Sequence, residues 1–457
     1  MEAGFETIGN ATLICYDRAP VLVTDPWIVG SAYFGSWLLS HEIPEEQMSA
    51  IKSCEYVWIS HGHPDHLSGE SLDMLRNKKI LLPDHVGGRI AHVMRKEGFH
   101  CTILKDRVWT RLSPQIRVLC IADYNQDALL LVDVAGTLVI DLNDTSDRGW
   151  GHFVRSIIKN YEHTFLLRIF GYGDADMINY FDENNVRIEP QAARKLPVGK
   201  SIALTAERFG ARYVIPFSSL HKYQRADSVW ANEYTTPLDA YAIGFTSNRC
   251  ELLPAFMRYD CLSKSFTEIN PPAAPDNVVD PKIFGDDLLE QLEKDEFQKL
   301  EIYFKSISHI QECMDYINFR VGGKDNHIEF RTRGFTKGIT FEVPRNSLMQ
   351  AIEFEIFDDL LIGNFMKTRL EGKWLSPSLY PDFAPYVAKY ADNGRAKTPE
   401  ELKQYFREYR RRAPLDYLRH RIPYRVCSDF LSHVQADTRV YQFARKTWRF
   451  AQAARWI

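Results

Sequence analysis

The sequence has no C-x-x-C pair, although eight cysteines are spread over its 457 residues. Scattered cysteines in a chain of this length indicate reduced thiols and favour a cytoplasmic location over a disulfide-stabilised one. The same scatter excludes an internal iron–sulfur cluster with the usual cysteine spacing. If the chain carries out redox chemistry, we therefore expect a different cofactor.

Long apolar runs and a strong charge imbalance are also missing. No stretch approaches the ~20 apolar residues that span a bilayer, so we expect no transmembrane segment. The N-terminal residues lack the basic start and the apolar run of a signal peptide. The formal net charge is only -4, which gives no general attraction to nucleic acid. These features predict a globular chain, long enough for two or three domains, with no nucleic-acid partner.

Metal-binding side chains are concentrated in residues 60–68. They are His61, His63, Asp65 and His66, in the pattern H-x-H-x-D-H. Grouping imidazoles and carboxylates this closely is unfavourable unless a cation holds them, and metal ions accept both at about 2.0–2.2 Å. A turn can direct the first two histidines at one ion and the remaining pair at a second ion beside it.

The residues around this motif predict a strand, a turn and a helix. Residues 55–59 have the apolar composition of a short buried strand, and residues 69–75 are typical of the start of a helix. The motif is therefore expected on a turn at the C-terminal end of a strand, where α/β folds usually place their chemistry.

The H-x-H-x-D-H pattern resembles the metal signature of the metallo-β-lactamase superfamily. The resemblance implies an α/β protein built as an αβ/βα sandwich with a dinuclear metal site at one edge. Residues 5–9, 11–16 and 20–24 fit the strands that open this fold. Because the fold hosts hydrolases, oxygenases and redox proteins, the motif alone does not define the reaction.

Two further stretches resemble the CMP-N-acetylneuraminate hydroxylases. Residues 25–44 contain D-P-W-I-V-G-S-A-Y-F, and residues 354–370 contain D-D-L-L-I-G-N-F. Lactonases acting on L-ascorbate 6-phosphate and phospholipases D acting on N-acylphosphatidylethanolamine are more distant relatives. The hydroxylases carry a Rieske iron–sulfur domain that this sequence does not match, so we expect electrons from a separate ferredoxin or reductase.

By the resemblance, the first metal takes a third ligand from the turn between the predicted strands 116–121 and 128–134. Asp123 falls on this position, and Asp127 is the alternative. An aspartate in place of histidine supplies a hard oxygen donor and favours iron or manganese over zinc. We therefore expect two metal ions, with iron favoured and zinc or manganese as alternatives.

The remaining ligands are also implied by the family pattern. Asp144 follows the predicted strand 136–140, and its carboxylate would bridge the two metals; Asp141 is its rival. His221 follows the predicted strand 211–217 and is the candidate for the last ligand or for a substrate contact. Ser219 fits the family's shorter offset from that strand.

Asp25 follows the predicted strand 20–24. The resemblance implies that it orients a ligand histidine through the second ring nitrogen, and a role in a turn before proline is the alternative. Weak substrate candidates come from an aromatic loop and from the basic residues after His221; they are Trp37, His41, Lys222 and Arg225. The two cations would suit an anionic group, although solvated loop charges are the alternative.

Composition divides the chain into three predicted regions. Residues 1–270 form the catalytic domain, residues 271–395 an α+β accessory region after a proline-rich linker, and residues 396–457 a basic helical extension. In the last region a helix is expected with Thr398 as its N-cap and Pro399 at its first position. The arginines that follow would dock an acidic protein partner, an anionic substrate or a membrane surface, or would pack on the rest of the chain.

Together these features favour a dinuclear O2-dependent oxygenase or hydroxylase that acts on a polar small molecule. The alternative is a metal-dependent hydrolase of a lactone, amide or phosphodiester, which attacks through a metal-bound hydroxide. Asp65 and Asp144 are the catalytic candidates, and in the hydrolase Asp65 would orient or deprotonate the water. A binding protein without catalysis is disfavoured by the intact motif.

Overall fold

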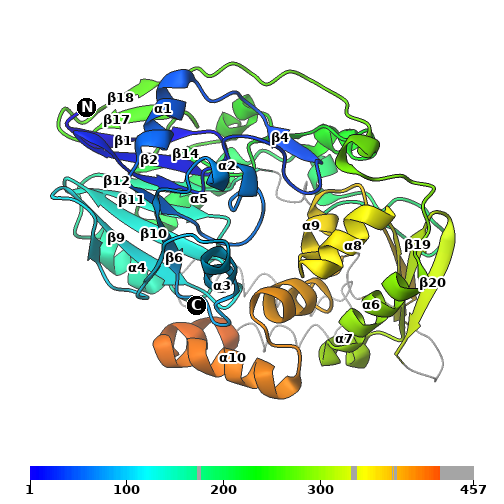
Figure 1. Cartoon of the computed structure of the whole chain (residues 1–457). Helices are drawn as coiled ribbons and strands as arrows, with labels where there is room; N and C mark the ends of the chain where they lie inside the picture. Colours follow the sequence, from blue (N-terminus) through cyan, green and yellow to red (C-terminus); the bar gives the residue numbers. More distant parts are fainter. Residues whose placement is uncertain (172–176, 331–336, 373, 375–377, 423–457) are drawn as a thin grey trace, which may run out of the picture.

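Two β-sheets pack face to face in the N-terminal part of the chain, and helices cover both outer faces (Figure 1). The structure is a computed structural model that describes residues 1–171, 177–330, 337–372, 374 and 378–422. The predicted α/β class and αβ/βα sandwich are confirmed. The first sheet has the strand order β18 (Ser265–Glu268), β17 (Met257–Asp260), β1 (Ala3–Ile8), β2 (Thr12–Asp17), β3 (Ala19–Thr24), β5 (Tyr56–Trp58), β6 (Lys79–Pro83) and β7 (Cys101–Leu104).

The second sheet packs against the first through a core of alternating apolar side chains. Its strand order is β16 (Glu251–Leu252), β14 (Tyr213–Pro216), β12 (Thr164–Arg168), β11 (Thr137–Asn143), β10 (Ala128–Val134), β9 (Ile116–Ala122) and β8 (Thr110–Arg111). Phe5 meets Phe165 edge to face across the two sheets, with ring centroids 4.9 Å apart. β10 is apolar at nearly every position because both faces of this central strand are buried.

Four helices bury the outer faces of the sandwich. α1 (Glu45–Ser53) and α3 (Arg89–Lys96) lie on the first sheet, and α4 (Gly151–Ile158) and α5 (Gly199–Phe209) lie on the second. Side chains such as Ile14 and Val23, which alternate with those of the inner core, pack against these helices. This alternation produces the four layers.

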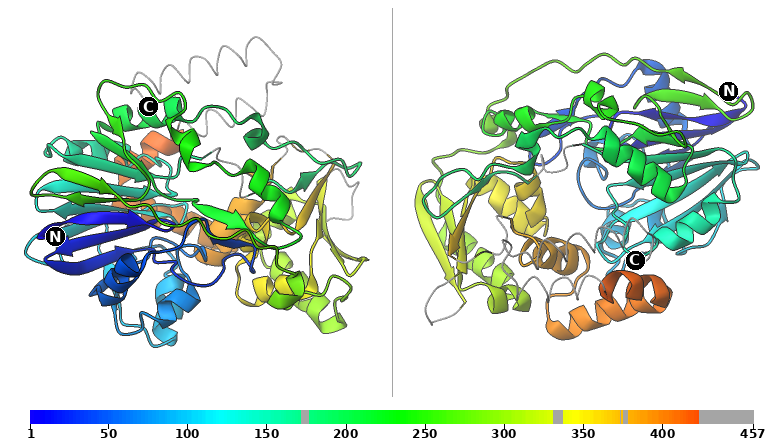
Figure 2. Two further views of the ribbon diagram at one scale, coloured as in Figure 1. Left: turned by 90° about the horizontal axis from the view of Figure 1, so that it is seen from above. Right: turned by 180° about the vertical axis from the view of Figure 1, so that it is seen from behind.

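The accessory region is built on a five-stranded sheet beside the sandwich (Figure 2). Its strand order is β13 (Tyr180–Phe181), β22 (Lys367–Gly372), β21 (Lys337–Glu342), β19 (Tyr316–Val321) and β20 (Lys324–Glu329). Its helices are α6 (Lys294–Lys305), α7 (Ser308–Cys313), α8 (Arg345–Glu353), α9 (Phe357–Ile362) and the π-helix η5 (Pro385–Asn393). β13 lies within the predicted catalytic domain, so the expected boundary at residue 270 is crossed by one strand of this sheet.

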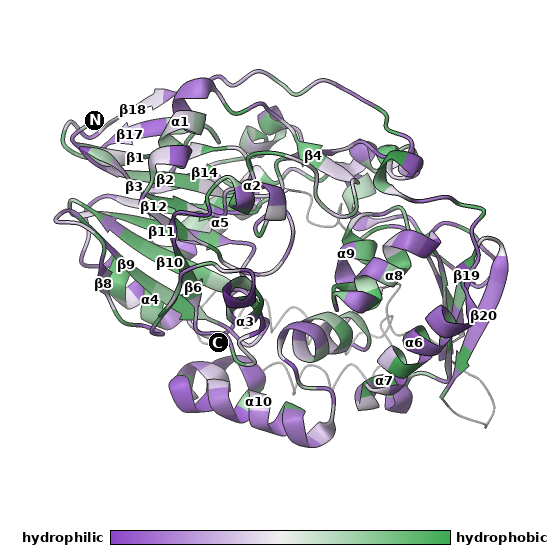
Figure 3. Cartoon of the chain, viewed as in Figure 1, coloured by the Kyte–Doolittle hydropathy of each residue, from purple (hydrophilic) through white to green (hydrophobic). Residues whose placement is uncertain are grey.

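The helix α10 (Pro399–Arg412) begins at the predicted residue. Thr398 and Glu401 form a reciprocal capping box, which satisfies backbone donors of the first turn. Tyr405 and Tyr409 on its inner face are buried, and its outer face is hydrophilic (Figure 3). The predicted tail beyond residue 422 lies outside the described residues.

Membrane-spanning helices and disulfides are both absent from the residues that the structure describes. No helix in the described ranges is long and apolar enough to cross a bilayer. None of the seven cysteines in these ranges forms a disulfide. The cytoplasmic location stays a prediction.

Strand direction determines where the functional loops meet. β3 and β5 are parallel in the first sheet, and β11, β12 and β14 are parallel in the second. The C-terminal ends of these strands lie at one edge of the sandwich, which is the edge that faces the accessory region (Figure 1). The loops that follow them bring the predicted ligands together there.

Candidate metal centre

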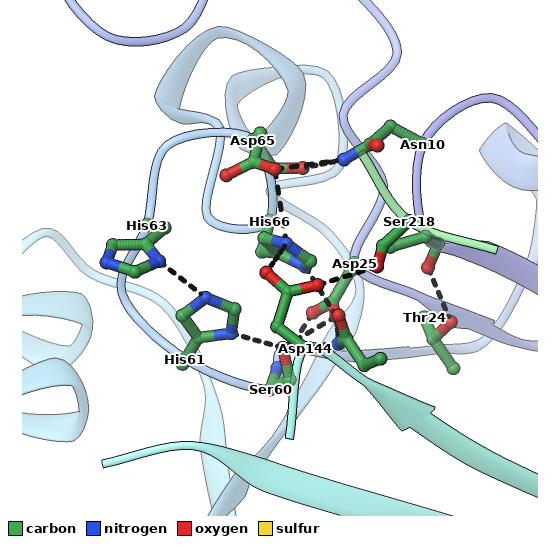
Figure 4. Close-up of polar contacts among 12 residues, drawn as sticks. Asn10, Thr24, Asp25, Ser60, His61, His63, Asp65, His66, Asp144 and Ser218 are labelled. Atoms are coloured by element: carbon green, nitrogen blue, oxygen red, sulfur yellow. Dashed lines mark hydrogen bonds and ion pairs between the residues drawn. The ribbon is translucent and has the colours of Figure 1, made fainter. Parts of the chain in front are cut away.

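The first two motif histidines point at each other and at the loop after β11 (Figure 4). Nε2 of His61 lies 2.8 Å from Nδ1 of His63. One ligand atom each of His61, His63 and Asp144 lies within 4.8 Å of the other two. This group offers two imidazoles and one carboxylate to a single ion.

A second group forms around His66, on the other side of Asp144. Nε2 of His66 lies 3.2 Å from Oδ2 of Asp65 and 3.3 Å from Oδ2 of Asp144. Within the described residues this nitrogen has no hydrogen bond of acceptable geometry. Asp144 thus lies between the two groups, in the place of a bridging ligand.

Asp25 contacts Ser60 and His66 and thereby orients the histidines of this cluster. Its carboxylate accepts hydrogen bonds from the Ser60 backbone N–H at 2.7 Å and from the Ser60 hydroxyl at 2.6 Å. It also lies 3.0 Å from Nδ1 of His66, and the Ser60 hydroxyl lies 2.8 Å from Nδ1 of His61. Two imidazoles are therefore oriented through their second nitrogen, which leaves Nε2 of each directed at the cluster.

The carboxylates have outer partners that the sequence did not reveal. Oδ1 of Asp65 accepts from the Tyr33 hydroxyl at 2.5 Å, and Oδ2 accepts from Nδ2 of Asn10 at 3.0 Å. The Ser218 hydroxyl donates to Oδ1 of Asp144 at 2.6 Å. Asn10 lies between β1 and β2, and Tyr33 lies in an irregular loop with φ of 52°, so no periodic pattern marked either residue.

His221 lies on β15 (His221–Tyr223), which pairs with β4 (Trp37–Leu39). Its ring stacks on Trp37 at an interplanar angle of 4°. Neither ring nitrogen forms a hydrogen bond to the residues that the structure describes. Burial lowers the pKa of His221 to about 3, against the opposing field of Asp65 and Asp144, so the ring is neutral and has an available lone pair.

Asp123 is not brought into either group. Its turn folds back on itself, with Oδ1 of Asp123 accepting from the backbone N–H of Asn125 at 2.8 Å and its backbone N–H donating to Asp127 at 2.9 Å. Asp127, the alternative, lines a cavity together with His63, and its Oδ1 lies 3.5 Å from Nζ of Lys389. The expected third ligand is thus engaged in local contacts.

Asp141, the rival of Asp144, is buried beneath the cluster. Burial and the neighbouring Asp25 raise the pKa of the Asp141 carboxyl well above its usual value. The protonated form is favoured, and Asp141 does not line the cavity that Asp144 lines.

The two basic substrate candidates are used within the protein. Nζ of Lys222 donates to the Ala274 carbonyl at 2.8 Å and to Asp276 at 2.7 Å. Arg225 is completely buried and forms ion pairs with Asp227 and Asp286 at 2.9 and 2.8 Å. Both cations are therefore directed away from the cluster.

His41 also lies apart from the cluster. It bonds to Ser40 and lines a separate cavity of about 440 Å³ with Phe256. Of the four substrate candidates, Trp37 alone reaches the centre, through its stack on His221.

A cavity of about 670 Å³ opens beside the cluster, between the sandwich and the accessory region. Its polar lining includes His63, Asp144, Arg168, Asp358 and Lys389. Apolar side chains form another part of its wall; they are Ile169, Phe170, Met177 and Ile178. Arg168, Asp358 and Lys389 are new relative to the sequence prediction, although Asp358 lies in the second stretch that resembles the hydroxylases.

The electrostatics of the cluster suit a bound cation. Burial opposes protonation of His66, yet the carboxylates of Asp65, Asp144 and Asp25 raise its pKa well above the usual value. A proton on His66 thus partly offsets a concentration of buried negative charge, which is costly when unpaired. Metal ions would supply the compensating positive charge in place of that proton. They would also bind Nε2 of His66, which has no hydrogen bond to the described residues, so the donor set fits a metal centre.

The sandwich with an H-x-H-x-D-H loop at its edge has the architecture of the metallo-β-lactamase fold. No family model matches the sequence. The chain is 30% identical over 156 residues to the cytidine monophosphate-N-acetylneuraminic acid hydroxylase of Danio rerio, covering 32% of this chain and 26% of that protein. It is 27% identical over 140 residues to the hydroxylase of Asterias rubens, covering 29% and 21%.

The chain thus matches about a quarter of the length of these curated relatives. Among solved structures, it is similar to CmlA, a diiron β-hydroxylase from Streptomyces venezuelae, with a TM-score of 0.33, 13% identity and coverage of 51% of this chain and 46% of that one. It is also similar to Igni18, a metallo hydrolase from Ignicoccus hospitalis, with a TM-score of 0.32, 12% identity and coverage of 59% and 99%.

Proposed function

We propose that this chain is a dinuclear O2-dependent oxygenase that hydroxylates a polar small molecule. The observation that carries the proposal is the group of His61, His63 and Asp144. Two histidines and one carboxylate with open positions are the ligand pattern of non-haem iron oxygenases. The curated relatives, which are named as hydroxylases, support the same reaction class.

In this proposal His61, His63 and Asp144 hold one metal ion. Asp65, His66 and His221 hold the other, and Asp144 is shared. Iron is favoured, with zinc or manganese as alternatives. When bound, two irons would supply the redox chemistry that inserts one atom of O2 into a C–H bond, while the other atom leaves as water with two electrons and two protons. A separate ferredoxin or reductase would provide these electrons.

The residues of the chain bind the substrate and exclude water. The cavity beside the cluster admits a small molecule, and its apolar wall would cover the reacting carbon. Arg168 lines this cavity at the end of β12, and its Nε has no hydrogen bond to any residue that the structure describes. We propose that this guanidinium, in place of Lys222 and Arg225, binds an anionic group of the substrate.

Metal content and O2 use test this proposal. Protein from minimal media supplemented separately with iron, zinc or manganese is analysed for bound metal. The iron form is then assayed with a chemical reductant and cytidine monophosphate-N-acetylneuraminic acid, the molecule in the relatives' names. We expect two irons per chain, O2 consumption and a product with one added oxygen atom.

The same preparations distinguish the hydrolase. Two tightly bound zincs, with turnover of a chromogenic ester or phosphodiester in the absence of O2, would replace the oxygenase by the hydrolytic alternative. In that case Asp65 would orient the attacking water. The charge of His66 outweighs the effect of burial and lowers the pKa of Asp65, which keeps the Asp65 carboxylate ionised.

A further inference from the structure

The outer hydrogen bond of His63 comes from a distant part of the chain. The other two motif imidazoles take their outer partners from loops of the sandwich, as described above. Nε2 of His63 instead lies 3.0 Å from Oδ2 of Asp358, which is 295 positions further along the sequence. Asp358 belongs to α9 of the accessory region.

The two nitrogens of His63 face different parts of the molecule. Nδ1 faces Nε2 of His61 at 2.8 Å, inside the ligand group that includes Asp144. Nε2 faces away from that group, toward Asp358. The ring therefore connects the ligand cluster to the accessory region, with one nitrogen available to each.

The carboxylate of Asp358 is held by a well-packed element. Phe357 and Leu360, on either side of it in α9, are fully buried in the core of the accessory region. Asp358 itself is only 4% exposed. Lys389 of the π-helix η5 lines the same cavity and makes a further polar contact with the sandwich through Asp127. A carboxylate on so rigid a support can determine the orientation of the ring that it binds.

We propose that Asp358 is a positioning residue that completes the metal centre from the accessory region. Its carboxylate accepts the Nε2–H of His63, which fixes the tautomer whose lone pair is on Nδ1 and directs that lone pair at the metal. The accessory region is thus part of the metal centre, as well as one wall of the cavity. The inference rests on the proposed metal centre but not on the reaction carried out there.

The test measures metal affinity of the full chain with Asp358→Asn. The metal-free protein is titrated with Co²⁺ and Zn²⁺ against a chromophoric chelator, and the visible absorption of the cobalt form is recorded. We expect an affinity about 10- to 100-fold weaker than that of the native chain, with a changed cobalt spectrum. Asp315→Asn is the control, because Asp315 is also buried in the accessory region and belongs to neither histidine–carboxylate group, and it should have a smaller effect.

A second measurement needs no variant at position 358, so it decides the case if Asp358→Asn does not fold. Ring ¹⁵N shifts of the zinc-loaded native chain, assigned by the loss of signals in His63→Gln, should show His63 protonated on Nε2 and metal-bound through Nδ1. Protonation on Nδ1, or a folded Asp358→Asn chain that binds zinc as the native chain does, would overturn the inference. Equal losses in both aspartate variants would also overturn it, because negative charge alone would then explain them.

The outcome is separable from that of the proposed function. A zinc affinity that depends on Asp358 in a chain that consumes no O2 supports this inference and contradicts the oxygenase. A native chain that binds no metal overturns both.

Discussion

At the scale of single residues, His63 differs from a surface histidine because each of its ring nitrogens faces a polar side chain. His63 contacts the cluster through Nδ1 and α9 through Nε2, whereas His92 on α3 is exposed. We expect His63→Ala to lose bound metal and activity, because it removes one ligand and the link to Asp358. His92→Ala is the control and should keep both. Metal analysis after gel filtration measures the difference, and a metal-replete, active His63→Ala chain would refute the ligand assignment.

Arg168 gives a second prediction at this scale. A hydrogen bond to a charged group contributes about 1.5–3 kcal/mol, so Arg168→Met should raise KM for an anionic substrate about 10- to 100-fold. The value of kcat should change much less, because the guanidinium binds a group away from the reacting carbon. Arg208→Met is a suitable control, since Arg208 lies near Asp147 in the same neighbourhood but does not line the cavity. Similar KM values for both variants and the native enzyme would contradict the assignment.

Spacing in the sequence identifies some of the candidate site residues and misses others. The four candidate ligands of the motif are close in sequence, so a local pattern is sufficient to propose them together. Arg168 ends strand β12 of the sandwich and Arg225 follows the short strand β15, and no local pattern separates the two arginines. The difference arises from Asp227 and Asp286, which pair with Arg225 in the folded chain, and the partner at position 286 is remote in sequence.

At the scale of elements, the strands of the sandwich were predictable because their apolar residues alternate or run continuously. Helix ends were less predictable. The helix η1 (Gln191–Arg194) is separate from α5, since Lys195 adopts a positive φ of 43° and Pro197 follows. The helix α6 begins at Lys294, where Glu293 and Glu296 form a capping box that hydrophobic periodicity does not show.

The π-helix η5 carries a prediction on pH. Burial raises the pKa of Asp392 to about 8, against the hydrogen bonds of the Tyr303 hydroxyl at 2.9 and 2.8 Å. The unfolded carboxyl titrates near 3.9, so between about pH 4 and pH 8 the folded chain binds the additional proton and stability falls as pH rises. Asp392→Asn should remove that part of the slope.

Urea unfolding at several pH values measures this effect. The slope should flatten in Asp392→Asn, with the largest gain relative to the native chain near pH 8. Asp295→Asn, at an exposed position of α6, should retain the native slope. An unchanged slope in the Asp392 variant would show that the carboxyl is ionised in the folded chain.

At the scale of the whole molecule, the sandwich and the accessory region are connected by pairings that a linear division of the sequence cannot represent. β13 lies between two elements of the sandwich in sequence but pairs in parallel with β22 of the accessory sheet, with Tyr180 opposite Thr368. Conversely, the side chain of Asp358 in the accessory region contacts His63 in the sandwich. Such contacts join residues far apart in the chain, and composition and periodicity report only neighbours, so the regions were predictable while their connection was not.

This connection predicts that metal binding stabilises both regions. A metal at 100 times its Kd stabilises the folded chain by about 2.7 kcal/mol, and His63 would transmit part of that constraint to α9. In hydrogen–deuterium exchange we expect zinc loading to slow exchange in residues 60–66 and also in α9 and η5, with the β19–β20 hairpin as the internal control. In Asp358→Asn at saturating zinc the effect on residues 60–66 should persist while the effect on α9 is lost. Slowing confined to the sandwich in the native chain would mean that the accessory region forms the cavity wall without sharing in the metal centre.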